Sequence, residues 1–228
     1  MKKLTSYFTK TEILLWSISV VLIIGSFLLF DRESYLTLTA SVIGVTSLIF
    51  CAKGNPAGQV LMIIFSIIYA VVSFSFSYYG EMITYLGMTL PMAVFSLISW
   101  LKNPYKGKKS EVAVNKLHKK EIIFASVLTI TVTVIFYFIL KYLKTENLYV
   151  STFSVTTSFA AAYLTFRRSP YFALLYAMND IVLIVLWIYA SFSDISYISV
   201  VICFIVFFAN DMYGFISWRK MEKRQLVR

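Results

Sequence analysis

Residues 170–191 read PYFALLYAMNDIVLIVLWIYAS, an apolar run without a basic residue and with one carboxylic acid, Asp180, near its middle. A helix of ~20 mostly apolar residues is long enough to cross the hydrocarbon core of a bilayer. Similar runs fill most of the 228-residue chain, in which 59% of residues are hydrophobic and the mean hydropathy is +0.78. We therefore predict an all-α polytopic membrane protein with eight transmembrane helices, at about residues 12–30, 34–51, 57–79, 82–101, 121–141, 148–166, 170–191 and 196–218.

Other classes fit the sequence poorly. The apolar runs are continuous rather than alternating, which excludes a β-barrel, and the longest polar loop, residues 102–120, is too short for a soluble domain. The two cysteines, Cys51 and Cys203, lie in apolar runs and His118 lies in the polar loop, so no disulfide, metal site or cofactor is expected. The first run lacks a small-residue cleavage site, so we interpret it as a retained helix and not as a signal peptide.

The basic residues are distributed unequally between the loops. If the chain crosses the bilayer eight times, one side holds 18 Lys and Arg residues, whereas the other holds three, Arg32, Lys141 and Lys144. Short loops rich in Lys and Arg stay in the cytoplasm. We therefore expect both termini to be cytosolic, in the inner (cytoplasmic) membrane. We assign the net charge of +10 to contact with anionic lipid in the bilayer, and expect no nucleic-acid partner.

A three-helix unit occurs twice. Pro56 and Pro170 open the third and seventh runs at an offset of 114, and Ile-Ser-Trp recurs at 98–100 and 216–218 at an offset of 118. Because the copies start an even number of crossings apart, they have the same orientation and form parallel repeats. The predicted order is 3+1+3 helices after one extra helix: residues 1–33, the repeat 34–101, the basic loop 102–120, the linker helix 121–147 and the repeat 148–228.

Trp100 and Trp218, the last residues of the two Ile-Ser-Trp motifs, need an explanation of their own. Basic residues follow closely after both, at Lys102 and Arg219. Tryptophan followed by a positive charge at the end of a span is typical of the aromatic belt at the membrane surface. We therefore expect both indole rings to lie at the lipid interface.

Two acids inside the runs are the strongest candidates for function. Asn179-Asp180 and Asn210-Asp211 lie within the seventh and eighth runs, and no basic residue lies inside any run to neutralise them. A charged group at that depth costs at least ~2.5 kcal/mol. Each acid is therefore protonated, hydrogen-bonded to hydroxyl or backbone groups, or exposed in a cavity that receives a cation.

Aromatic residues share a helix face with the first of these acids. Tyr176 and Trp187 lie on the Asp180 side, and an aromatic face attracts a flat cationic ring by ~0.5 to 2 kcal/mol. A polar face on the third run, with Gln59 and Tyr69, occupies the equivalent place in the first repeat. The predicted site for a small-molecule substrate, between the repeats, consists of Gln59, Tyr69, Tyr176, Asn179, Asp180, Trp187, Asn210 and Asp211.

Residues 34–220 resemble the PnuC family of vitamin transporters. The resemblance depends on the 3+1+3 order, on the sequence GNPAGQ at 54–59, on Arg167-Arg168, and on NDMYGFISW at 210–218. It implies a relative of the SWEET transporters that carries a vitamin precursor by facilitated diffusion, with trapping by a cytosolic kinase and assembly as a homo-oligomer.

The substrate is less certain than the family. Carriers of nicotinamide riboside often have an acidic-Asn-Trp-Leu-Leu-Trp run where residues 171–176 read YFALLY, and a Gly-Trp-Tyr-x-Trp run where residues 95–100 end in ISW. The unpaired acids favour the two cations nicotinamide riboside and thiamine over neutral riboflavin. The resemblance to nicotinamide riboside transporters implies nicotinamide riboside as the expected substrate of a uniporter. A uniporter for thiamine or a deoxynucleoside, and a proton-coupled carrier of small solutes, remain alternatives. An enzyme is not expected, because neither a His or Cys constellation nor a set of acidic metal ligands occurs. ATP-driven pumping is not expected either, because no Walker loop occurs.

Overall fold

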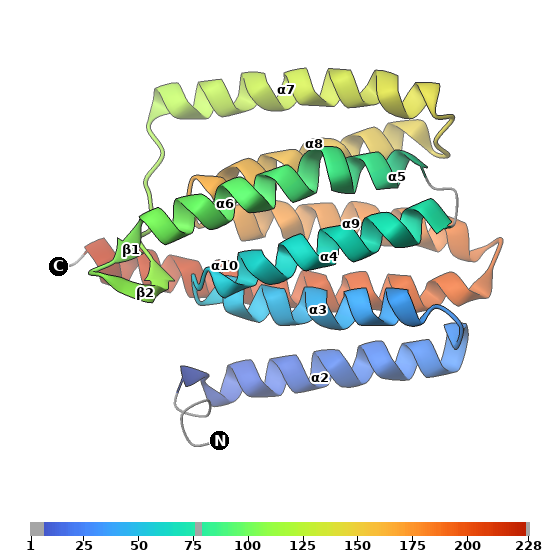
Figure 1. Ribbon diagram of the computed structural model, residues 1–228, viewed down its shortest axis with the longest axis horizontal. Coiled ribbons are helices and arrows are strands. Elements are labelled where there is room, and N and C mark those ends of the chain that lie inside the picture. Colours follow the sequence, from blue (N-terminus) through green and yellow to red (C-terminus); the bar gives the residue numbers. More distant parts are fainter. Residues whose placement is uncertain (1–6, 76–78, 227–228) are drawn as a thin grey trace.

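Residues 7–75 and 79–226 are described by a computed structural model, in which long helices run side by side and both ends of the chain lie at one end of the bundle (Figure 1). A short antiparallel hairpin, β1 (Pro104–Tyr105) and β2 (Lys108–Val112), lies at that same end. The helices are α2 (Lys10–Ser26), α3 (Tyr35–Ala52), α4 (Ala57–Ser75), α5 (Tyr79–Thr84), α6 (Leu90–Lys102), α7 (Lys119–Tyr142), α8 (Leu148–Phe166), α9 (Tyr171–Ser191) and α10 (Ile198–Leu226).

The predicted polytopic helical fold is confirmed. Seven helical segments in the described part of the chain are long and apolar enough to cross a membrane, one of them formed by α5, a π-helical turn and α6 together. The eighth predicted span is α8, which has 19 residues but carries many Ser and Thr side chains. The helix ends agree with the predicted ones within about four residues, except that α10 continues to Leu226, well beyond the predicted end at 218. The third span was predicted to end at 79, whereas α4 ends at Ser75, and 76–78 lie outside the described residues.

The two repeats make equivalent contacts. In the first repeat α3 packs on α4 and α4 on α6; in the second, α8 packs on α9 and α9 on α10. Between the repeats, the last helix of each contacts the first helix of the other, so that α10 packs on α3 and α6 packs on α8. α2 and α7 lie at opposite edges of the bundle, against α3 and α8 (Figure 1). The helices of the repeats therefore surround one central region.

A proline explains an irregular turn beside this region. Pro91 lies in the first turn of α6, and its ring cannot accept the normal carbonyl position of residue 87, four residues earlier. The chain widens into a π-helical turn, Tyr85–Thr89, directly before α6. This turn directs Tyr85 toward the centre of the bundle.

The expectation that Trp100 and Trp218 lie at the lipid interface is wrong. Both side chains are 0% exposed, with ring centroids 5.4 Å apart, in a cluster that contains Val112 of β2. The Trp100 Nε1 donates to the Thr165 carbonyl at 2.9 Å, and the Trp218 Nε1 donates to the Cys51 carbonyl at 2.7 Å. The two acceptors are themselves separated by the repeat offset of 114. Each repeat therefore provides the hydrogen-bond acceptor for the tryptophan indole of the other repeat.

Candidate functional site

A cavity of about 390 Å³ lies between the two repeats. Side chains from α3, α4, α5, α8, α9 and α10 line it, and at one end it reaches the exposed residues Tyr79, Lys144, Glu146 and Asn147. These four residues lie where α5 begins and where α7 connects to α8, at the end of the bundle away from the chain termini (Figure 1). The volume is within the range of small-molecule sites, about 300 to 1,000 Å³.

Aromatic side chains close the bundle beyond the other end of the cavity. Trp100, Phe172 and Trp218 pack together there, with Phe172 5.0 Å from Trp218 between ring centroids. All three are at most 3% exposed. The cavity is thus open toward the α7–α8 connection and sealed toward the termini.

Two carboxyl groups meet in the deep part of the cavity. Asp180 of α9 and Asp211 of α10 are 4% and 5% exposed, both line the cavity, and their carboxyl groups lie close enough to interact electrostatically. Among the described residues, neither forms an ion pair, and the Asp180 Oδ2 has no hydrogen-bond partner. Two like charges this close repel each other, so a cation beside them is stabilised. An acceptor with spare capacity therefore faces the cavity.

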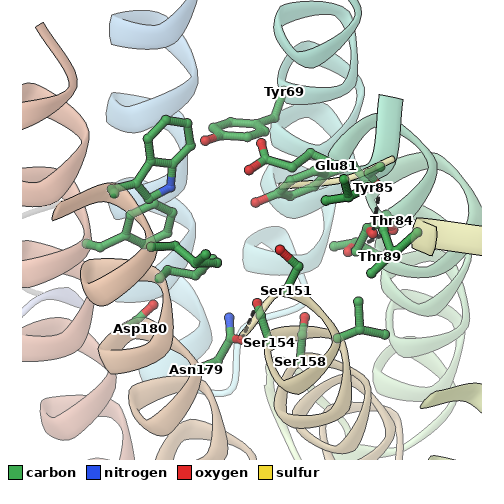
Figure 2. A pocket seen from close by; sticks show the side chains of 18 of the residues that line it. Tyr69, Glu81, Thr84, Tyr85, Thr89, Ser151, Ser154, Ser158, Asn179 and Asp180 are labelled. Atoms are coloured by element: carbon green, nitrogen blue, oxygen red, sulfur yellow. Dashed lines mark hydrogen bonds between the residues drawn. The ribbon is translucent and has the colours of Figure 1, made fainter. Parts of the chain in front are cut away.

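A third acid lies nearer the opening. Glu81 of α5 points into the cavity beside Tyr69 and Tyr85 (Figure 2). Together with Glu146 at the rim, the lining contains four carboxyl groups and one basic residue, Lys144. The balance of charge favours a positively charged ligand.

Aromatic rings form one wall of the cavity. Tyr69 and Tyr85 lie 4.5 Å apart between ring centroids, and Phe65 lies 5.5 Å from Tyr69. Trp187, on the Asp180 side, also lines the cavity and is 8% exposed. A flat cation between these rings would be held by cation–π attraction as well as by apolar contact.

Hydroxyl and amide groups of α8 and α9 form the facing wall. The Asn179 Oδ1 accepts hydrogen bonds from the Ser154 hydroxyl at 3.0 Å and the Thr157 hydroxyl at 2.9 Å. Ser151, Ser154 and Ser158 follow one face of α8 along the cavity (Figure 2). These groups can exchange hydrogen bonds with the hydroxyls of a sugar.

Six of the eight predicted site residues line the cavity and two do not. The six are Tyr69, Tyr176, Asn179, Asp180, Trp187 and Asp211. The Gln59 amide instead donates to the Cys51 sulfur at 3.3 Å, and the Asn210 amide donates to the Ser19 hydroxyl at 2.9 Å, which joins α10 to α2. Both of these side chains face other helices.

The sequence prediction omitted Glu81, Tyr85 and the serines of α8. Glu81 lies just before residue 82, where the fourth span was predicted to begin, and was therefore assigned to the loop. The spacing of Ser151, Ser154 and Ser158, three and then four residues, is a helical stripe, and it could have been found in the sequence.

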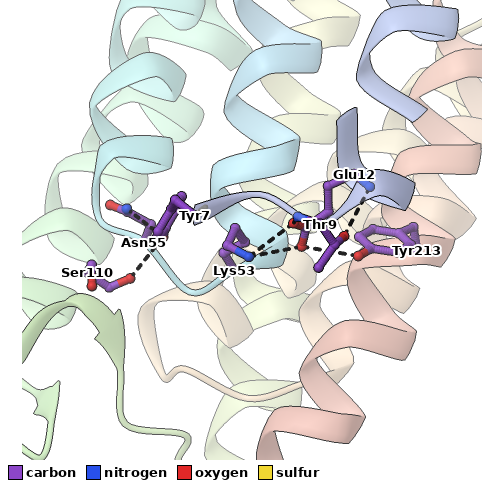
Figure 3. Close-up of polar contacts among 7 residues, drawn as sticks. All are labelled: Tyr7, Thr9, Glu12, Lys53, Asn55, Ser110 and Tyr213. Atoms are coloured by element: carbon purple, nitrogen blue, oxygen red, sulfur yellow. Dashed lines mark hydrogen bonds and ion pairs between the residues drawn. The ribbon is translucent and has the colours of Figure 1, made fainter. Parts of the chain in front are cut away.

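A second polar cluster joins α2 to the bundle and has no part in the cavity. Lys53 forms an ion pair with the buried Glu12 at 3.0 Å, and the Tyr213 hydroxyl donates to Glu12 at 3.2 Å (Figure 3). The Asn55 amide donates to the Tyr7 hydroxyl at 2.9 Å, and burial raises the pKa of Tyr7, which keeps the phenol protonated. Tyr213 is thus a partner of Glu12 and does not line the cavity.

Comparisons with known proteins decide the family. A model of the nicotinamide mononucleotide transporter family matches residues 34–220. The chain belongs to this family. The resemblance to the PnuC family is confirmed, and the protein is a multi-pass membrane transporter and not an enzyme.

Two members of the family are similar along most of their length. The chain is 25% identical over 199 residues to the nicotinamide riboside transporter PnuC of Neisseria mucosa, covering 86% of this chain and 76% of that protein. It also matches the crystal structure of the vitamin B3 transporter PnuC with a TM-score of 0.81 and 23% identity, over 96% of this chain and 94% of the other. The latter similarity supports the helical fold described above.

Proposed function

We propose that this transporter carries nicotinamide riboside by facilitated diffusion. The observation that carries the proposal is the pair Asp180 and Asp211, which lines a cavity of about 390 Å³ without a basic partner among the described residues. Nicotinamide riboside combines a flat, permanently positive ring with a sugar, and the cavity combines acids, aromatic rings and hydroxyl groups. The similarity to a nicotinamide riboside transporter supports the same substrate.

The residues divide into three roles. Asp180 and Asp211 supply negative charge to the ring, Tyr69, Tyr176 and Trp187 supply flat contact surface, and Asn179 with the α8 serines binds the sugar. A buried carboxylate near a cation contributes most of the discrimination against neutral analogues.

The direction of the path follows from charge. The end of the bundle that holds the termini and the 102–120 loop carries most of the Lys and Arg residues. We therefore place this protein in the inner membrane with that end in the cytosol. The cavity then opens outward. Transport requires the units 34–101 and 148–228 to move against each other, and phosphorylation of the substrate by a cytosolic kinase would keep uptake downhill.

A binding screen tests the proposal. Purified protein would be titrated with nicotinamide riboside, thiamine, a deoxynucleoside and neutral nicotinamide, with intrinsic tryptophan fluorescence and calorimetry as readouts. We expect nicotinamide riboside to bind at least about tenfold more tightly than the others, a difference of about 1.4 kcal/mol. Tighter binding of thiamine or of the deoxynucleoside would assign the site to that substrate instead.

Reconstituted vesicles test the mechanism. Labelled nicotinamide riboside should equilibrate down its own gradient in both directions, and an imposed proton gradient should not drive it above equilibrium. Accumulation driven by the proton gradient would replace uniport with proton coupling.

A further inference from the structure

The segment after β2 crosses the closed end of the transport path and joins both repeats. We name residues 112–115 the strap. The backbone N–H of Val112 donates to the Gly54 carbonyl at 2.9 Å, and the backbone N–H of Asn115 donates to the Arg168 carbonyl at 3.0 Å. Gly54 and Arg168 are separated by 114 residues, the offset of the repeat. The strap therefore binds the same turn in both repeats, at the α3–α4 and the α8–α9 connection.

The strap also lies directly over Trp100, Phe172 and Trp218, the aromatic seal at the closed end of the cavity. Val112 is 0% exposed and packs in the cluster of Trp100 and Trp218. The Val114 N–H donates to the Gln225 side chain of α10 at 2.8 Å, and the Gln225 amide donates to the Val112 carbonyl at 3.1 Å. The seal cannot open widely by separation of the two turns while both strap contacts persist, because the four residues of the strap reach only about 13 Å when extended.

The two anchors of the strap differ in conformational cost. Both anchor residues have left-handed backbone, with φ of +66° at Gly54 and +57° at Arg168. Glycine adopts this conformation freely, whereas a residue with a Cβ is strained in it. The first anchor is therefore relaxed and the second is strained.

Arg168 also carries a charge that lacks compensation. Its Nε and Nη1 atoms are buried and have no hydrogen-bond partner among the described residues. Burial and, after it, the neighbouring Arg167 lower the pKa of the Arg168 guanidinium. A buried, unpaired donor group is stabilised when a movement of the chain lets water reach it.

We propose that the strap is a latch on the closed end of the path, and that it detaches at the Arg168 anchor while the Gly54 anchor holds. Release of Asn115 removes one backbone link between the two repeats and allows Trp100 and Trp218 to separate more widely. The proposal concerns how the closed end opens and is independent of which substrate is carried.

Amide hydrogen exchange on the full chain in nanodiscs tests the order of release. The Val112 and Asn115 amides report on the two anchors separately, because each is the donor of one anchor bond. After correction for intrinsic rates, we expect Asn115 to be protected at least about tenfold less than Val112. Equal protection of the two amides would overturn the proposed order.

Two substitutions exchange the properties of the anchors. Arg168→Gly removes both the strain and the buried charge, so we expect protection at Asn115 to rise about tenfold and transport into vesicles to slow by a similar factor. Arg168→Asn, which tolerates left-handed backbone, should act in the same direction if the glycine variant folds poorly. Gly54→Ala would place a Cβ 3.2 Å from the Met221 Cε and 3.3 Å from the Val112 Cγ1, and should lower protection at Val112.

A matched control separates latch release from general loop strain. Lys106 also has positive φ, +49°, but it lies in the exposed hairpin turn and anchors nothing. Lys106→Gly should leave exchange at both amides and the transport rate unchanged. If Arg168→Gly also changes neither, or if it raises protection while transport stays at the wild-type rate, the strap is not a latch.

Discussion

Replacing Asp180 with Asn should weaken the binding of a cationic substrate without unfolding the protein. The amide has nearly the same shape as the carboxyl group, so the change removes charge and little else. Asp180 is 4% exposed and its Oδ2 atom is directed to no other described group, which makes it available to the ligand.

The magnitude follows from Coulomb's law at the dielectric of a protein site. A unit charge about 4 Å from a carboxylate gains about 4 kcal/mol at an effective dielectric constant of 20. Part of this attraction is offset by the loss of water from the cation. The net loss in Asp180→Asn should be about 1 to 3 kcal/mol, a factor of about 5 to 150 in Kd.

The neighbouring acid limits the effect of the single substitution. Because Asp180 and Asp211 both line the cavity, removal of one carboxyl group leaves the other able to carry the charge. The double variant Asp180→Asn/Asp211→Asn should therefore bind more weakly than either single variant. Calorimetric titration of all three with nicotinamide riboside gives the comparison, and helical circular dichroism checks the fold.

Asp194→Asn is the matched control. Asp194 is an exposed acid at the start of the 3₁₀ turn Ile195–Tyr197, where Asn also caps, and it does not line the cavity. Its replacement should not change Kd. If the double aspartate variant folds and binds the cation as tightly as the wild type, the carboxyl pair has no role in recognition.

Three further predictions concern other parts of the chain. Glu81→Gln should weaken binding of nicotinamide riboside by about 3- to 30-fold, as expected for loss of a less buried charge, and should leave any binding of neutral nicotinamide unchanged in the same titrations. Gly58→Ala should destabilise the protein by at least about 2 kcal/mol in thermal unfolding, because the new Cβ would lie 2.5 Å from the Cys51 sulfur and 2.9 Å from the Ser47 carbonyl oxygen at the α3–α4 contact. Lys109→Cys should resist an impermeant thiol reagent applied to intact cells and react after permeabilisation; labelling from outside would reverse the proposed orientation.

The sequence predicted the spans well because length and apolarity alone determine them. It also selected both aspartates that meet in the cavity, since an acid at membrane depth is costly wherever the helix faces. It could not predict their contact, which depends on how α9 and α10 are rotated against each other.

Helix faces were the harder problem. In a membrane bundle, residues that face lipid and residues that face other helices are both apolar, so periodicity does not mark the inward side. Gln59 and Asn210 lie on buried faces, but those faces contact Cys51 and α2 instead of the cavity. The wrong prediction for Trp100 and Trp218 also concerned which way a side chain faces. The hairpin that covers these two residues gives no apolar signal in the sequence, so their burial could not be predicted.

The exchange of tryptophan bonds between the repeats determines when each bond can form during synthesis. The Trp100 indole has no acceptor until Thr165 emerges, 65 residues later, and the Cys51 carbonyl must wait 167 residues for Trp218. The first three-helix unit therefore enters the membrane with the Trp100 indole N–H unpaired at its inner face, whereas the Cys51 carbonyl already accepts from the Gly54 N–H. The first unit gains both of these tryptophan hydrogen bonds only after the last helix has been inserted. The two units are therefore synthesised one after the other but complete their folding together.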